Sequence, residues 1–290
     1  MPLIDHSQHH EFRTAGISVL SSAVAQRQEI APVRLLLLDF DSLSSGGTTD
    51  TTRELPSGNS QSLTGLLALL SNTPLQVEIE IDLPAPGTIN FDGVIASASD
   101  PAQVPAAFSA LLPSSSASLL MGEAARSDLH VRHGIMAEQL TRPLTEIIQH
   151  RITDDGSPLT AGQEPLVDVP VARTWRISIS AISEHPTLQV LAHAPKAGVH
   201  VVYEPAIRRL FVLNHLALTP LGFARQQRRL TPQPVRDGRD PQHDDTILPP
   251  YTWRSHAHLL IAAWLNSDVY LPISLLVKNI GASGFRVGRI

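Results

Sequence analysis

The stretch SASLLMGEAARSDL, residues 116–129, decides the predicted fold, because it changes from a strand pattern to a helix pattern at Gly122. The same order of strand and helix recurs along the first half of the chain. Alternating strands and helices predict an α/β fold, with a parallel central sheet that carries helices on both faces. Ligands of such folds bind near the carboxyl ends of the strands. Gly122 lies at one of these ends.

Three strands are predicted before this stretch. Residues 33–38 form a continuous apolar run, as a strand buried on both faces requires. Residues 75–83, LQVEIEIDL, alternate between apolar and polar side chains, and residues 91–99, FDGVIASAS, form the third strand. Two helices, at residues 63–72 and 101–113, are expected to connect these elements.

The second half of the chain is rich in predicted strands, with little sequence between them. These strands are expected at residues 174–183, 188–194, 199–205 and 208–215, with a hairpin at residues 204–207. A helix near residues 221–230 and a final helix at residues 251–266 follow. The simplest organisation is a polar lead, residues 1–29, before one domain, residues 30–290. A long loop rich in Ser, Thr and Gly, residues 41–61, interrupts that domain.

The composition limits the classes of function. The chain has 290 residues, of which 42% are hydrophobic, and a net charge of -5. This charge gives no general attraction to nucleic acid or to acidic membranes, so neither is expected as a partner. No apolar run has the length of a membrane span and no secretion signal is recognised, so a cytoplasmic location is expected. The chain has no cysteine, which excludes disulfides, thiolate metal sites and a cysteine nucleophile.

Four segments resemble the homoserine O-acyltransferase family. IAPVRLLLLDF (30–40), LLALLSNTPLQVEIEI (66–81) and FDGVIAS (91–97) are similar to that family's first elements, and WRSHAHLLIAAWLN (253–266) is similar to its C-terminal helix. The family comprises the homoserine O-succinyltransferases and O-acetyltransferases of methionine biosynthesis. The resemblance implies the class I glutamine amidotransferase-like fold of that family, with a β-rich second half in this chain, and a homodimer.

The resemblance also implies where the chemistry would lie. The family takes the acyl group from coenzyme A on a cysteine at a strand-to-helix turn, and a histidine and a glutamate activate that cysteine. The matching turn here, LLMGEAA, carries Gly122 at the cysteine position. The motif FVLNHLAL keeps the histidine as His215 but has Ala217 at the glutamate position. Two of the three catalytic side chains are therefore expected to be missing.

The part of the site that holds the acceptor is better preserved. The family binds the carboxylate of its amino acid with arginines, because a planar guanidinium can form two parallel hydrogen bonds with a carboxylate. Arg254, in TWRSH, matches one such position, and Arg173, in VPVARTW, matches the other. Asp240 lies in a segment that resembles the family's motif before the last helix. The implied ligand is a small amino acid or another carboxylate.

Two functions stay open. The first is a degenerate homologue without the cysteine nucleophile, which binds a small amino acid or carboxylate, or acts as a partner or regulatory subunit. The alternative is an active O-acyltransferase that moves an acyl group directly from acyl-coenzyme A to a hydroxyl of homoserine or a related compound, with His215 as general base. No cofactor and no metal are expected, and acyl-coenzyme A is a co-substrate only in the active case.

Other polar residues have simpler explanations. Three serines lie near the site without occupying the turn, so solvation of a loop or strand is their expected role: Ser97, Ser99 and Ser118. The histidine-bearing segments 6–10 and 242–245 could bind a metal, but clusters this loose are usually solvated. His256 and Trp264 are expected to seat the last helix by packing and hydrogen bonding.

Overall fold

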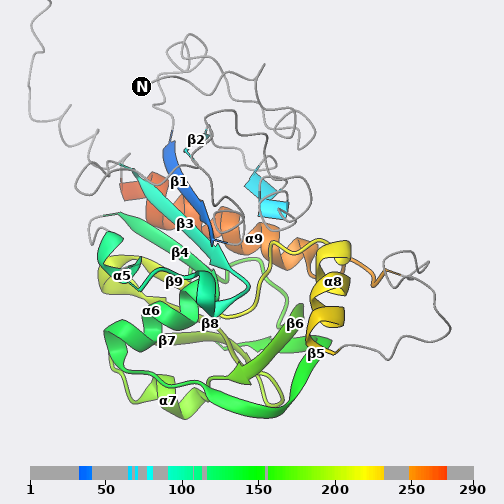
Figure 1. Cartoon of the computed structure of the whole chain (residues 1–290). Helices are drawn as coiled ribbons and strands as arrows, with labels where there is room; N and C mark the ends of the chain where they lie inside the picture. Colours follow the sequence, from blue (N-terminus) through cyan, green and yellow to red (C-terminus); the bar gives the residue numbers. More distant parts are fainter. Residues whose placement is uncertain are drawn as a thin grey trace, which may run out of the picture.

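A mixed β-sheet flanked by helices forms the centre of the fold (Figure 1). The computed structural model describes residues 33–40, 65–66, 69–70, 77–80, 91–106, 108–112, 116–153, 156–231 and 248–272. The predictions for the lead 1–29, for the loop 41–61 and for Asp240 lie outside these residues. Within the described part of the chain, nine strands belong to the sheet.

The first half of the sheet is parallel, as the alternating pattern predicts. Its strands are β1 (Val33–Asp39), β2 (Val77–Glu80), β3 (Gly93–Ala98), β4 (Ala117–Gly122) and β9 (Arg209–Val212), in the order β2-β1-β3-β4-β9. The leucines of β1 are buried because both faces of this strand are covered. The predictions for the first three strands and for the strand before the turn are confirmed.

The second half of the sheet is antiparallel and joins the first half along β9. β8 (Gly198–Glu204) pairs with β9, and β7 (Gln189–Ala194), β5 (Glu138–Ile152) and β6 (Leu166–Arg176) follow in that order. The predicted hairpin between β8 and β9 is confirmed. The sequence pattern does not predict the 15-residue β5, because most of its side chains are exposed or half-buried and it contains a proline.

Helices cover both faces of the sheet, as predicted. Leu35 of β1 belongs to the core beneath α8 (Pro220–Leu230) and α9 (Arg254–Trp264). Leu36, whose side chain points to the other face, belongs to the core beneath α6 (Glu123–His133). Figure 1 shows α6 and α9 on opposite sides of the sheet. The fold is therefore α/β, with a sheet that is parallel only in its first half.

The prediction of one continuous helix at residues 101–113 is wrong. This segment contains a short 3-10 helix, η1 (Pro101–Gln103), and the four-residue helix α5 (Phe108–Leu111). Pro105 explains the break, because a proline cannot donate a hydrogen bond inside a helix and disfavours helical backbone in the residue before it. That residue, Val104, is extended, with φ −77° and ψ 116°.

The strand expected at residues 174–183 is correct only in its first part. β6 ends at Arg176, and the short helix α7 (Ile179–Ser183) follows. The side chain of Ser178 accepts a hydrogen bond from the amide of Ala181, at 3.3 Å, and caps this helix. A serine in a run of alternating residues therefore begins a helix rather than continuing the strand.

The predicted C-terminal helix is confirmed as α9, and a π-helical segment, η4 (Leu265–Tyr270), continues it. Trp264 is fully buried, which confirms the expected packing, but its indole nitrogen has no hydrogen-bond partner among the described residues, so the expected hydrogen bond is wrong. The indole N–H of Trp253 donates to the carbonyl of Leu218 at 3.0 Å, which fixes the start of the helix to the segment after β9. Among the described residues, no helix combines the length and the apolar character needed to span a membrane.

Candidate functional site

A sharp turn joins β4 to α6. The strand ends at Gly122 and the helix begins at Glu123, as the sequence predicts. Gly122 has φ 61° and ψ −126°, a backbone conformation that residues with a side chain rarely adopt. Strand-to-helix turns with a strained central residue expose that residue at the carboxyl edge of the sheet, which is where several enzyme classes place a nucleophile.

The space for a side chain at residue 122 is already filled. A Cβ atom added to Gly122 would lie 2.4 Å from the carbonyl oxygen of Ala98, closer than Cβ atoms are found in proteins. Ala98 is the register partner of Gly122 on β3, so the obstruction is backbone rather than a flexible side chain. A side chain here would require the end of β3 to shift. We call Gly122 and Ala98 the closed turn.

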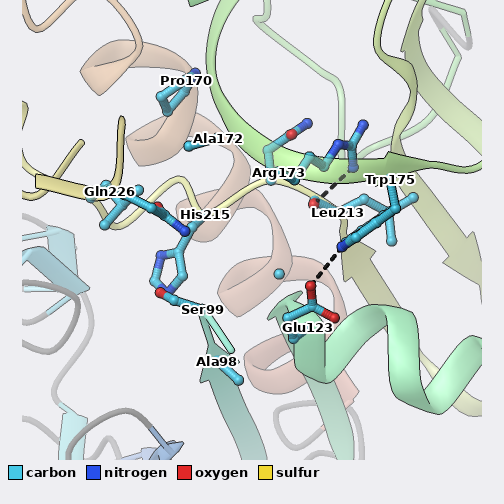
Figure 2. A pocket seen from close by; sticks show the side chains of 13 residues that line it. Ala98, Ser99, Glu123, Pro170, Ala172, Arg173, Trp175, Leu213, His215 and Gln226 are labelled. Atoms are coloured by element: carbon cyan, nitrogen blue, oxygen red, sulfur yellow. Dashed lines mark hydrogen bonds between the residues drawn. The ribbon is translucent and has the colours of Figure 1, made fainter. Parts of the chain in front are cut away.

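A pocket lies beside the closed turn, at the carboxyl ends of the parallel strands (Figure 2). The empty space in and at the mouth of the pocket, open solvent included, is about 320 Å³. Its lining includes residues 98–99 at the end of β3, Gly122 of β4 and residues 213–215 after β9. Further lining residues, among them Arg173 of β6 and Gln226 of α8, come from the antiparallel half and from a covering helix. The position agrees with the rule for ligands of α/β sheets.

His215 lies in this pocket. It is 5% exposed, and its Cδ2 atom lies 3.6 Å from the place that a Cβ of residue 122 would take. Figure 2 shows His215 and Ser99 among the residues that line the pocket. A hydrogen bond of 3.1 Å from the amide of Leu218 to the carbonyl of His215 holds the turn that follows. The role of His215 as a general base stays a prediction.

Ala217, two residues after His215 in the chain, is fully buried. Its carbonyl oxygen packs against the helical residue Gly65, where an added Cβ would come within 1.7 Å of it. The two backbones are therefore in contact, which only a glycine permits. A methyl side chain at residue 217 has no carboxylate with which to orient an imidazole.

The three serines near the site differ in their surroundings. Ser97 donates to Oδ1 of Asp39 at 3.2 Å, and Ser118 accepts from Nε of Arg209 at 3.1 Å. These two serines are buried and make hydrogen bonds inside the fold, so solvation is the wrong explanation for them. Ser99 is half-buried and lines the pocket.

Arg173 also lines the pocket, but its guanidinium is already engaged. Nη1 donates to the carbonyl of Leu213 at 3.0 Å, and Nη2 donates to the carbonyl of Ala197 at 2.6 Å. Nη2 also donates to the carbonyl of Val199 at 3.4 Å, so three of the five N–H groups of the guanidinium bind carbonyls inside the fold. Nε–H has no partner among the described residues. The guanidinium also stacks on Trp175, with Cζ 4.5 Å from the ring centroid. Burial lowers the pKa of Arg173 to about 9, which keeps it charged at neutral pH.

Glu123, the first residue of α6, places a negative charge near Arg173. Its carboxylate is buried, accepts a 2.6 Å hydrogen bond from the indole of Trp175 and forms an ion pair with Arg126. The positive end of the helix dipole also favours a carboxylate in this first turn. No sequence pattern points to Glu123, apart from its place directly after the turn. Charge balance at the site therefore depends on a residue that sequence reasoning misses.

Three residues that line the pocket each carry a buried polar atom with no hydrogen-bond partner among the described residues. These atoms are Nε of Arg173, Oδ1 of Asn214 and Oε1 of Gln226. The first is a donor on a charged group, and the other two are amide oxygens that accept. Buried polar atoms are nearly always paired in folded proteins, so each unpaired one requires an explanation such as a ligand or a water. We call these three residues the polar lining.

Arg254 lies outside this pocket. It is exposed at the start of α9, with Cζ 6.0 Å from the centroid of the Tyr251 ring, and it is not among the residues that line the pocket beside Gly122. The structure therefore brings Arg173, His215 and Gly122 together but does not add Arg254 to them. Its assignment as a carboxylate-binding residue stays a prediction.

Comparisons with known proteins bear on the resemblance. The family model described as homoserine O-succinyltransferase matches residues 113–275, more than half of the chain. The chain belongs to the homoserine O-succinyltransferase family. A homoserine O-acetyltransferase of a Synechococcus species is 26% identical over 295 residues, covering 89% of this chain and 94% of that protein. The homoserine O-succinyltransferase of Shewanella baltica is 26% identical and covers 88% of each chain.

The family predicted from the sequence is therefore confirmed. Solved structures similar to this chain share little sequence with it. A glutamine amidotransferase from Thermotoga maritima has a TM-score of 0.49 at 9% identity, over 82% of this chain and 99% of that one.

Proposed function

We propose that this homoserine O-succinyltransferase family member binds a small amino acid or a related carboxylate without forming an acyl-enzyme on a cysteine. The observation that carries the proposal is the closed turn, where backbone occupies the space that a nucleophilic side chain would need. The chain has no cysteine to supply a thiolate from elsewhere. Catalysis through a covalent intermediate on cysteine therefore has neither its nucleophile nor room for it at this turn.

The polar lining supports ligand binding at the same place. Nε–H of Arg173 is a charged donor that can bind a carboxylate, and the amide oxygens of Asn214 and Gln226 can accept from an ammonium or a hydroxyl. A small amino acid carries both kinds of group. It would therefore satisfy polar atoms that have no partner among the described residues, and each such hydrogen bond to a charged group contributes about 1.5–3 kcal/mol.

Isothermal titration calorimetry with L-homoserine tests the binding proposal. We expect saturable binding to the wild-type chain and a loss of at least about tenfold in affinity for Gln226→Ala, because one acceptor is removed. Glu184→Gln, an exposed change at the end of α7, is the control and should leave the affinity unchanged. Absence of binding at millimolar concentration would contradict the proposal.

Direct acyl transfer is the competing function, and the position of His215 favours it. An imidazole beside the turn can deprotonate an acceptor hydroxyl while a thioester is held alongside, so positioning would supply most of the rate. Release of coenzyme A from acetyl- or succinyl-coenzyme A with a panel of hydroxy amino acids separates the two functions. Turnover that His215→Ala abolishes would favour direct transfer, and no turnover above the buffer rate is the result expected here.

A further inference from the structure

A line of hydrogen-bonded side chains runs through the core to the pocket. Oε1 of Gln163 lies 3.0 Å from Nδ1 of His256, and Nε2 of His256 lies 3.0 Å from Nε2 of His200. Nδ1 of His200 lies 3.0 Å from Nδ2 of Asn214, which belongs to the polar lining. The two histidines and Asn214 are between 0% and 4% exposed. We call these four residues the histidine line.

One backbone carbonyl sets the direction of the first hydrogen bond. Nε2 of Gln163 lies 3.3 Å from the carbonyl oxygen of His256, and a carbonyl oxygen can only accept. The amide nitrogen of Gln163 must therefore face this carbonyl, which leaves the amide oxygen facing Nδ1 of His256. Since an amide oxygen cannot donate, His256 carries its proton on Nδ1.

The remaining hydrogen bonds of the histidine line also have fixed directions. Burial lowers the pKa of His256 to about 3 and holds the pKa of His200 well below its usual value, so both rings are neutral at pH 7. A neutral imidazole has one N–H, so Nε2 of His256 is an acceptor and Nε2 of His200 must donate to it. Nδ1 of His200 is then an acceptor, and the NH₂ group of Asn214 must face it.

The consequence for Asn214 is a fixed amide orientation. A reversed amide would place its oxygen against the bare Nδ1 of His200, so two acceptors would face each other in a buried site. Oδ1 is therefore directed away from His200, and no described residue donates to it. The amide of Asn214 is therefore held in one of its two possible orientations, with the nitrogen facing His200 and Oδ1 facing away from it.

We infer that Oδ1 of Asn214 is a preorganised acceptor for a donor group of the pocket ligand, an ammonium or a hydroxyl, and that His200 and His256 are positioning residues for it. The inference rests on the proposed function, because it needs a ligand in the pocket beside Gly122. It adds selectivity to that function: the pocket favours a ligand with a donor group at this point, since a ligand without one leaves the buried oxygen unpaired.

Other roles of the two histidines predict different behaviour. If they only fill space and seat α9, ligand binding in the pocket does not depend on them. The 3.0 Å separation between the two ring nitrogens is a hydrogen-bond distance. No group of three or more potential metal ligands occurs in the part of the chain that the structure describes.

Nuclear magnetic resonance of the wild-type chain, labelled with ¹⁵N-histidine, tests the direction of the line without any ligand. We expect His200 to be protonated on Nε2 and His256 on Nδ1, two opposite tautomers in contact. His200 protonated on Nδ1, or either ring doubly protonated at pH 7, would overturn the inference. This measurement needs no substitution, so it does not depend on whether a variant folds.

Calorimetry with three compounds tests the acceptor itself. L-homoserine carries an ammonium and a hydroxyl, 4-hydroxybutanoate lacks the ammonium, and L-2-aminobutanoate lacks the hydroxyl. We expect the wild-type chain to bind one of the two analogues at least about tenfold more weakly than L-homoserine, which identifies the donor that Asn214 binds. Asn214→Ala should remove that difference. Asn266→Ala, which removes an exposed amide, is the control and should leave all three affinities unchanged.

The outcomes separate the inference from the proposed function. If Asn214→Ala weakens binding of the three compounds equally, the inference is overturned and the proposed function stands. If none of the three compounds binds to the wild-type chain, the proposed function fails and the inference fails with it. A difference between the compounds that disappears only in Asn214→Ala supports both.

Discussion

The closed turn and the polar lining meet in one pocket but differ in what they leave available. At the closed turn, the carbonyl of Ala98 occupies the place of a side chain on Gly122. In the polar lining, three buried polar atoms have no partner among the described residues. On the proposed function, the capacity to bind and the capacity to form a covalent bond are carried by separate residues of the same site. The proposal therefore requires that one was lost while the other was kept.

Acid is expected to have the largest effect, and it acts on the two histidines of the histidine line and on His150, whose ring centroid lies 5.1 Å from that of His200. Burial is the main cause that lowers the pKa of His150 to about 4 and of His256 to about 3, and it holds the pKa of His200 well below its usual value. In the unfolded chain these groups titrate near pH 6.5. Below that pH the unfolded state binds more protons than the folded state, so stability is fully present above pH 6.5 and is lost as the pH falls towards 4.

The expected slope is roughly 1.4 kcal/mol of unfolding free energy per pH unit for each histidine that stays neutral in the fold. Urea unfolding between pH 7.5 and pH 4.5 measures it. His150→Gln should reduce the slope by about one proton, because it removes one of the buried groups. Stability that is independent of pH over this range would contradict the neutral histidine line.

A side chain at the closed turn should cost about 3 kcal/mol or more of unfolding free energy. Gly122→Ala would combine a positive φ with a Cβ only 2.4 Å from a backbone oxygen. Gly134→Ala is the matched control, since its φ is 68° and nothing lies within 4 Å of the added Cβ. The control should cost only about 1–2 kcal/mol, from the left-handed backbone. Urea unfolding measures both variants. An equal loss of unfolding free energy in Gly122→Ala and Gly134→Ala would show that the turn has room for a side chain.

Arg173→Lys should destabilise the fold by about 2 kcal/mol, because an ammonium cannot donate to carbonyls on both sides and loses the stacking on Trp175. Arg176→Lys, on the same strand, is the control. Arg176 pairs with Glu138 on the surface, so its replacement should change the stability by less than about 0.5 kcal/mol. Similar melting temperatures for the two variants would mean that the buried hydrogen bonds of Arg173 contribute little.

Arg254→Ala should have the smallest effect on stability, within about 0.5 kcal/mol, because the side chain is exposed. The resemblance predicts that it nevertheless weakens binding of L-homoserine by about tenfold, through a lost contact with the carboxylate. Calorimetry measures this directly. An unchanged affinity would remove Arg254 from the site and leave carboxylate binding to the polar lining alone.

The sequence predicts the parallel half of the fold and the turn because these features are local. The apolar run of β1 and the strand-to-helix change at Gly122 each lie within a few residues, and periodicity detects them. The sequence does not predict β5, because Pro143 and the half-exposed side chains of this strand break the alternation that is typical of a strand. The helix expected at residues 101–113 fails for a local reason too, since Pro105 interrupts it.

The candidate site is only partly predictable, because its decisive contacts join distant parts of the chain. The resemblance brings His215 and Arg173 to notice, and both lie in the pocket. No sequence pattern reveals that the terminal nitrogens of Arg173 donate hydrogen bonds to carbonyls 24 and 40 residues away. The contact between His200 and His256 joins residues 56 apart in the chain. Such contacts follow from the register of the sheet and the placement of α9, which composition and periodicity do not determine.

Intact-protein mass spectrometry after incubation with acetyl- or succinyl-coenzyme A tests the central claim most directly. The homoserine O-acetyltransferase of Synechococcus serves as the comparison protein. We expect no added acyl mass on the wild-type chain, and none on Gly122→Cys, because backbone at the closed turn leaves no room for the new side chain. A stable acyl adduct on the wild-type chain would contradict the claim that covalent transfer has been lost. An adduct on Gly122→Cys alone would contradict the claim that the turn is closed.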